Sequence, residues 1–157
     1  MTSRIHLVRH AKAKNRAEWT EPDEARPLTK RGRREAAAIA ERLRDETVAR
    51  LVASPFVRCV QTLEPLAETL DLAIETTDLL AEGADGGRAL DLLFSLCRPH
   101  SIAACTHGDV LYDVVRIAEA SGVRLDGPID APVASAWVLE VDDGRVVGAM
   151  FVEQPPR

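Results

Sequence analysis

The sequence predicts an α/β fold, a three-layer α/β/α sandwich with a mainly parallel central sheet and an antiparallel hairpin near its C-terminal end. Two patterns predict it. Short apolar runs, typical of buried strands, alternate with segments whose apolar residues recur at helical spacing. The last two apolar runs instead flank Asp142-Asp143-Gly144, a sequence typical of a tight hairpin turn. We expect a single domain over residues 1–157, with residues 153–157 as a frayed tail.

The first expected strand is the apolar run at residues 5–8, which ends just before Arg9 and His10. After a turn at residues 27–29, apolar side chains recur every three or four positions, at Ala36, Ile39, Ala40 and Leu43. This spacing predicts a helix with one buried face.

A second short strand is expected at residues 51–53, followed directly by Ser54 and Pro55. Serine is a favoured N-cap and proline suits the first helical position, so we expect a helix to begin here. Its apolar face would consist of Phe56, Cys59, Val60, Leu63, Leu66, Ala67 and Leu70. This start places Arg58 in the first helical turn, where free backbone N–H groups favour an anion.

The middle of the chain repeats the pattern, with an expected strand at residues 72–76 and a loop at residues 79–87. A third helix is indicated by Leu90, Leu93, Phe94 and Cys97. A strand at residues 101–105 then ends at Thr106-His107-Gly108.

The last part of the chain begins with a helix that carries Leu111, Val114, Val115 and Ala118 and stops at Gly122. The hairpin strands are expected at residues 136–141 and 146–152. In sheets of this kind, ligands bind beyond the carboxyl ends of the strands. Six polar or glycine residues lie just past such ends: Arg9, His10, Ser54, Arg58, His107 and Gly108.

The charge distribution favours an anionic ligand near the N-terminal end. The net charge is −5, but residues 1–34 carry ten Lys and Arg against four Asp and Glu. A nucleic-acid surface is the competing interpretation, which the aromatic content of 4% and the lack of a nucleic-acid motif disfavour. No apolar stretch approaches the length of a membrane span, and Cys59, Cys97 and Cys105 include no CxxC pair. We therefore expect a cytoplasmic protein with reduced thiols and no membrane or nucleic-acid partner.

Two arginines and two histidines at the strand ends suit phosphoryl transfer. A phosphoryl group in transfer spreads negative charge over three oxygens, and the planar fork of arginine matches such oxygens at any physiological pH. Arg9 and Arg58 fit this role, and a neutral ring nitrogen of His10 can attack phosphorus. A lone histidine at a strand end is more often structural, but His107 at a second strand end favours a shared cleft. His6 and His100 are assigned no role.

Four blocks of sequence together resemble the histidine phosphatase superfamily: Leu-Val-Arg-His at residues 7–10, Arg-Pro-Leu-Thr at 26–29 with Gly32, Ser-Pro-Phe-Val-Arg-Cys-Val-Gln-Thr at 54–62, and Thr-His-Gly at 106–108. The compact chain is most similar to the short bacterial phosphohistidine phosphatase branch. The resemblance implies the α/β/α fold, His10 as the nucleophile, and Arg9, Arg58 and His107 as the phosphate-binding residues.

Two positions depart from the family pattern. Ala11 stands where the family usually has glycine after the nucleophile, which is tolerable if the residue keeps a negative φ. Asn15 is not at the offset of the asparagine that often reaches the phosphate, so it stays a weak candidate for phosphate contact. Glu82 lies in the region where the family often carries a catalytic acid. Asp109 is the alternative acid, although it could instead cap the following helix.

The leading functional hypothesis is a metal-independent phosphatase without a cofactor, acting on phosphohistidine, another phosphoprotein or a small phosphorylated metabolite. A metal site built on His10, His107 and Asp109 is disfavoured by two arginines in the same cleft, which repel a divalent cation. A non-catalytic phosphate-binding module and, less favoured, a phosphomutase are the alternatives. The sequence leaves the natural substrate and the oligomeric state open.

Overall fold

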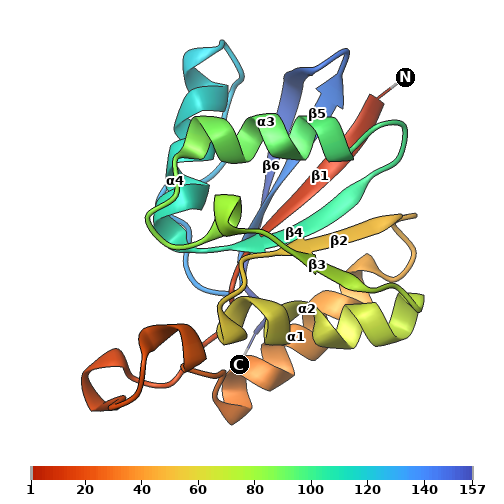
Figure 1. Cartoon of the computed structure of the whole chain (residues 1–157). Helices are drawn as coiled ribbons and strands as arrows, with labels where there is room; N and C mark the ends of the chain where they lie inside the picture. The colour runs from red at the N-terminus through yellow and green to blue at the C-terminus, as the bar shows by residue number, and fades with distance from the viewer. Residues whose placement is uncertain (1, 157) are drawn as a thin grey trace.

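The computed structural model describes residues 2–156 and contains one mixed six-stranded sheet (Figure 1). The strand order is β3-β2-β4-β1-β5-β6. The first four of these pair in parallel, whereas β5 pairs antiparallel with both β1 and β6. The strands are β1 (Thr2–Arg9), β2 (Arg50–Ala53), β3 (Ile74–Thr76), β4 (Ile102–Thr106), β5 (Ala136–Asp142) and β6 (Arg145–Val152).

Helices cover both faces of the sheet. In Figure 1, α1 (Lys30–Leu43) and α2 (Val57–Leu70) lie below it, whereas α3 (Gly86–Leu96) lies above it and α4 (Gly108–Ala120) at its left, both against the other core. Three short 3-10 helices complete the described chain: η1 (Arg16–Glu18), η2 (Asp23–Ala25) and η3 (Asp78–Leu80). The predicted three-layer α/β/α sandwich, with a mainly parallel sheet and a C-terminal antiparallel hairpin, is therefore confirmed.

Two apolar cores lie between the sheet and the helices, one on each face of the sheet. Successive side chains of a strand point to opposite faces, so Leu7 of β1 packs in the core beneath α3 and α4, while Val8 packs in the core against α1 and α2. Both cores consist mainly of Leu, Val, Ile and Ala, as the low aromatic content predicts. Trp137 is the exception. It is fully buried, and its Nε1–H donates to the carbonyl of Pro128.

The predicted start of α2 at Ser54 and Pro55 is wrong by two residues. The helix begins at Val57, and its N-cap is Phe56, whose side chain makes no capping bond. The hydroxyl of Ser54 instead accepts from the backbone N–H of Phe56 at 3.2 Å and lies 2.9 Å from Nε2 of His107. Ser54 therefore lies in a turn before the helix, where its hydroxyl is close to His107. Arg58 still lies in the first helical turn.

Other element boundaries shift for local backbone reasons. The strand expected at residues 72–76 is limited to Ile74–Thr76, because Asp71 ends α2 in the left-handed conformation and the N–H of Leu72 bonds back to the helix. The hairpin turn is as predicted, with positive φ at Asp143 and Gly144. Residues 153–156 have no regular secondary structure, and Arg157 of the predicted tail lies outside the described residues.

His6 of β1 is a buried histidine whose two ring nitrogens have no hydrogen-bond partner among the described residues. Burial and, secondarily, the nearby charges of Arg42 and Arg4 lower its pKa to about 4. The unfolded chain therefore binds a proton at His6 below about pH 6.5, where the folded protein does not. Stability from this group is complete above that pH and decreases as the pH falls toward 4.

We predict that the free energy of unfolding decreases by about 3 kcal/mol through His6 as the pH falls across this window. In His6→Leu, that contribution disappears, so the unfolding free energy should vary less with pH than in the wild type. Urea unfolding followed by circular dichroism at several pH values measures the difference. Parallel pH curves for the two proteins would show that His6 is not held neutral by burial.

Candidate active site

The candidate site lies at the carboxyl ends of three neighbouring parallel strands. Arg9 at the end of β1 is in register with Thr106 of β4, and Ala53 of β2 is in register with Cys105. The residues that follow these ends therefore lie side by side, although they are far apart in sequence. They are His10 after β1, Ser54 after β2 and His107 after β4.

His10 has a neutral ring with one nitrogen available for attack. Its Nδ1 lies 2.8 Å from the carbonyl oxygen of Ala11, and because a carbonyl can only accept, Nδ1 carries the hydrogen. This leaves Nε2 with a free electron pair. Burial lowers the pKa of His10 to about 3; the hydrogen bond with Ala11 opposes this, and the nearby charges of Arg58 and Arg9 add to it, so the ring is neutral at physiological pH.

The backbone beside His10 is held by side chains of the neighbouring helices. The N–H of Ala11 donates to Oγ1 of Thr62 in α2, and the N–H of Lys12 donates to Glu35 in α1. Ala11 keeps a negative φ, so the condition for replacing the family's glycine is met.

His107 is buried opposite His10, and the two ring centroids are 5.4 Å apart. It is the N-cap residue of α4. One ring nitrogen, Nε2, lies 2.9 Å from Oγ of Ser54, and the other, Nδ1, lies 3.5 Å from Nη2 of Arg58. The imidazole is thus fixed at one nitrogen by Ser54, while the other is beside the guanidinium.

Arg58 is fully buried, with 0% of its surface exposed, in the first turn of α2. Its Nη1 donates to the carbonyl of Asp23 at 2.8 Å, and its Nη2 donates to the carboxylate of Asp23 at 2.9 Å. The ring of Phe56 lies under the guanidinium at 4.9 Å. Burial alone would raise the pKa of Asp23, but the hydrogen bonds from Arg26 and Arg58 outweigh it and lower that pKa.

Arg9 is the second guanidinium at the site. Its Nη1 donates to the carbonyl of Ala131 at 2.6 Å, and its Nε has no partner among the described residues. A Cβ at Gly108 would lie 2.9 Å from Cζ of Arg9. The Arg9 guanidinium therefore packs closely against the backbone of Gly108.

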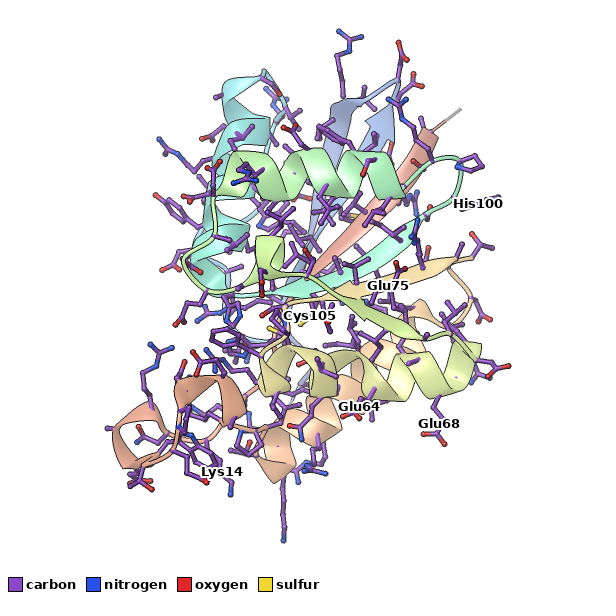
Figure 2. The ribbon with its side chains drawn as sticks, viewed as in Figure 1. Lys14, Glu64, Glu68, Glu75, His100 and Cys105 are labelled. Carbon is purple, nitrogen blue, oxygen red and sulfur yellow. The ribbon has the colours of Figure 1, made fainter. Side chains whose placement is uncertain are left out.

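An open cleft of about 1320 Å³ leads to His10 and Arg9. Most of its charged lining is positive, from Arg9, Lys12, Lys14, Arg16 and Arg26, and the acids that line it are Glu82, Asp109 and Asp130. Figure 2 shows Lys14 on the N-terminal segment that projects beyond the strand ends, and His100 at the other end of the sheet. The cleft can therefore attract an anionic group to His10.

Glu82 lines the cleft, but its carboxylate is already paired. Its Oε1 accepts from Arg16 at 2.8 Å and lies 3.5 Å from Nη2 of Arg58. A carboxylate in these pairs is an acceptor, so proton donation from Glu82 requires Arg16 to release it.

Asp109 and Asn15 both make local backbone contacts. Asp109 does not cap α4, since the N-cap is His107, and its carboxylate accepts from the N–H of Gly83 at 2.8 Å. It therefore fixes the loop that carries Glu82. Asn15 lines the cleft and caps η1 through the N–H of Ala17.

Within residues 2–156, no group of three or more His, Cys, Asp or Glu side chains is arranged to hold a metal ion. Nor does any helix of this part of the chain have both the length and the apolar character needed to cross a bilayer.

The sequence model of the histidine phosphatase superfamily (branch 1) matches residues 5–88, more than half of the chain. The protein belongs to the histidine phosphatase superfamily. The match includes the segments that carry Arg9, His10, Arg58 and Glu82, and the structure adds His107 from beyond it.

Similar proteins include phosphatases named for different substrates. An 8-oxo-(d)GTP phosphatase of Mycolicibacterium smegmatis is 36% identical over 98% of this chain, which spans about half (49%) of that relative's length. The protein histidine phosphatase SixA, solved with tungstate, is 25% identical, with a TM-score of 0.69 over 96% of this chain and 95% of that one. A mycobacterial glucosyl-3-phosphoglycerate phosphatase, at 15% identity and a TM-score of 0.71 over 99% and 100%, shares the fold.

Sequence reasoning missed one site residue of this histidine phosphatase superfamily member, Asp23. It holds Arg58 through both its backbone carbonyl and its carboxylate. It is the first residue of the short 3-10 helix η2 between β1 and α1, where neither periodicity nor a turn motif distinguishes it from the neighbouring acids. The contact between Arg16 and Glu82 was also missed, because it joins two segments that are distant in sequence.

Proposed function

We propose that this protein is a phosphatase that accepts the phosphoryl group of its substrate on Nε2 of His10 and then transfers it to water. The observation that carries the proposal is the neutral ring of His10, with Nδ1 bonded to Ala11 and Nε2 unprotonated beside two guanidinium groups. In the first step, Nε2 forms a bond to phosphorus while the bond to the leaving group breaks. In the second, a water oxygen attacks phosphorus, the N–P bond breaks, and His10 is regenerated.

The surrounding groups supply the charge that this transfer needs. Arg9, Arg58 and His107 offer donors for the three equatorial oxygens, whose negative charge increases in the transition state. Asp23 holds Arg58 through two hydrogen bonds, so the position of the guanidinium is set before substrate arrives. We infer a reaction that needs no metal ion, because the two guanidinium groups of Arg9 and Arg58 can balance the phosphoryl charge.

The substrate is proposed to be a phosphorylated protein side chain, phosphohistidine foremost, or a small phosphorylated metabolite. A cleft of about 1320 Å³ exceeds the volume of a phosphate group and leaves room for a larger leaving group. The similar proteins are named as phosphatases of a nucleotide, of protein histidine and of a glucosyl-phosphoglycerate. Cytoplasmic location, and the absence of nucleic-acid and membrane partners, stay predictions.

The test of the proposal is hydrolysis of a chromogenic aryl phosphate in excess EDTA, together with acid quenching and mass measurement of the intact chain. We expect turnover in EDTA and a quenched population heavier by one phosphoryl group. Tight binding of inorganic phosphate without turnover would instead support the non-catalytic module. Isomerisation of a phosphometabolite without release of phosphate would support the mutase.

The substrate class is tested by comparing kcat/KM for a phosphohistidine carrier protein with that for a panel of phosphometabolites that includes nucleotides. A value for the carrier protein at least tenfold above the others would support phosphohistidine. The reverse order would assign a small metabolite.

Glu82 is the proposed proton donor to the leaving group, and Glu82→Gln tests it. A poor leaving group needs a proton most, so we predict that the substitution slows hydrolysis of alkyl phosphates far more than that of aryl phosphates. For phosphohistidine, whose nitrogen departs readily, the loss should be below about tenfold.

Arg16→Gln is the matched control, because it breaks the Arg16–Glu82 pair and keeps the carboxyl group. It should not reproduce the alkyl-selective loss. Equal slowing of every substrate by Glu82→Gln would indicate a binding or structural role of the loop. No slowing of any substrate would move the test to Asp109.

A further inference from the structure

Three cations line one wall of the cleft within a short stretch of chain. They are Lys12, Lys14 and Arg16, and Figure 2 shows Lys14 on the segment that projects beyond the strand ends. Ala13 pairs with Leu28 and is buried. Successive side chains of an extended segment point to opposite sides, so Lys12 and Lys14 are both exposed on the other side. The two lysines and Arg16 form a row, which we call the basic wall.

The two lysines of the basic wall are not neutralised by a neighbouring acid. Among residues 2–156, no ion pair joins either ammonium group to a carboxylate. The acids that line the cleft come from later parts of the chain: Glu82 after η3, Asp109 in the first turn of α4, and Asp130 before β5. An anion placed against the basic wall therefore meets positive charge that no adjacent carboxylate balances.

Three arginines share the carboxylate of Asp23, and they differ in exposure. Arg58 and Arg26 donate to it at 2.9 and 2.8 Å, and their side chains are 0% and 7% exposed. Arg58 also donates to the carbonyl of Asp23, and Arg26 to that of Lys14. Nε of Arg16 lies 3.8 Å from the same carboxylate, and its side chain is 62% exposed. Exposed ion pairs contribute little free energy, so Arg16 can leave its partners for an incoming anion, whereas the other two arginines are fixed.

A side pocket adjoins the basic wall. Its volume is about 380 Å³, and it shares Lys14, Asn15 and Thr29 with the cleft. Trp19 also lines it, and the indole is held by a hydrogen bond from its Nε1–H to the carbonyl of Pro22 at 3.0 Å. The basic wall therefore borders a hollow that can hold part of a leaving group beyond the phosphoryl group.

We propose that the basic wall is a second anion subsite, at which Arg16 donates to a carboxylate or phosphate group on the leaving group of the substrate. The inference rests on the proposed phosphatase function and narrows its small-metabolite class to phosphate esters that carry a second negative charge. The planar fork of Arg16 matches two oxygens of such an anion, and Lys12 and Lys14 supply the surrounding positive charge. The phosphoryl group stays with Arg9 and Arg58, so each anionic group has its own site.

Binding at this subsite also acts on Glu82. Nη2 of Arg16 donates to Oε1 of Glu82 at 2.8 Å, and Nη2 of Arg58 lies 3.5 Å from the same oxygen. When Arg16 turns to the substrate, Glu82 loses its shortest donor, and proton donation from Glu82 requires that release. A second anion therefore favours both binding of the substrate and protonation of its leaving group.

The experiment compares three aryl phosphates: phenyl phosphate, 3-carboxyphenyl phosphate and 1,3-phenylene bisphosphate. The first has no second anion, the second has a carboxylate, and the third has a phosphate. In wild type at low ionic strength, kcat/KM per ester should be about tenfold higher for a charged substrate than for phenyl phosphate, the effect of one charge-assisted hydrogen bond. The carboxylate and bisphosphate arms show which of the two anions the subsite prefers.

Arg16→Gln should remove this preference, so that the ratio of kcat/KM between charged and uncharged substrates falls about tenfold, to near one. Arg16→Lys should keep part of the ratio, because the charge remains without the planar fork. Arg34→Gln is the matched control. It makes the same charge change at an exposed arginine of α1 that does not line the cleft, and it should keep the wild-type ratio.

Binding is measured separately by calorimetry with benzylphosphonate, its 3-carboxy derivative and the corresponding bisphosphonate, in which a CH2 group replaces the ester oxygen and prevents hydrolysis. Wild type should bind a charged phosphonate about tenfold more tightly than benzylphosphonate, and Arg16→Gln should not. Absence of this preference from the wild-type affinities, or its persistence in Arg16→Gln, overturns the proposal. Tighter binding of a charged phosphonate without hydrolysis of any ester would count against the phosphatase function alone.

Discussion

His10→Ala is expected to reduce phosphatase turnover to below a few per cent of the wild-type rate, because the substitution removes the nitrogen that we propose attacks phosphorus. Nε2 of His10 is unprotonated, and His10 lines the cleft. His107, the other histidine at the site, has both ring nitrogens beside other side chains, Ser54 and Arg58. Phosphate binding should weaken less than turnover, since Arg9, Arg58 and His107 remain.

The measurement is kcat on an aryl phosphate, with phosphate affinity determined in parallel and the phosphoenzyme sought by mass. His100→Ala is the matched control, since His100 is exposed in the loop before β4 (Figure 2), and it should retain full activity. A His10→Ala protein that keeps more than a few per cent of its activity, or still becomes phosphorylated, would exclude His10 as the nucleophile.

Arg9→Lys and Arg58→Lys are each expected to lower kcat/KM by about ten- to a thousandfold. Lysine keeps the positive charge but loses the planar fork, and with it the paired donors that fit phosphoryl oxygens. At Arg58 the loss is compounded, because two nitrogens of its guanidinium hold the carbonyl and carboxylate of Asp23. A lysine cannot keep both bonds in that geometry and donate to the substrate as well.

Arg50→Lys controls for the general effect of this substitution, because Arg50 makes an exposed bidentate pair with Glu75 away from the cleft. It should leave kcat/KM unchanged. Thermal unfolding should accompany the kinetics, so that loss of the buried Arg58 contacts is not mistaken for loss of transition-state stabilisation. Wild-type kcat/KM in both Arg9→Lys and Arg58→Lys would show that phosphate binds elsewhere.

The order of strands and helices could be predicted from sequence because each element buries one face, and burial imposes a period on the apolar residues. The strand before His10 and the helix face of Ile39 and Leu43 are examples. The start of α2 could not be predicted in the same way. Ser54 is a residue type typical of an N-cap, but its hydroxyl contacts the N–H of Phe56 and the ring of His107. The contact with His107, which is distant in sequence, favours a turn at Ser54 and a later start of the helix.

The sequence could predict those residues of the candidate site that directly follow a strand. Arg9, His10 and His107 follow strands whose parallel pairing brings them together. The contacts of Asp23 with Arg58, and of Arg16 with Glu82, depend on the paths of two irregular loops. Such paths are set by many weak contacts between segments distant in sequence, and the local pattern of apolar and polar residues does not predict them.

Because the site depends on the parallel pairing of β1 with β4, we expect it to form late in folding. His10 and His107 lie far apart along the chain, and α1, β2, α2, β3 and α3 are all synthesised between them. Closing so long a loop costs chain entropy before any contact across it compensates, so the pairing of Arg9 with Thr106 is a slow, non-local event. In a refolding experiment, helical circular dichroism should recover before phosphatase activity, and the lag between them would report the assembly of these two strands.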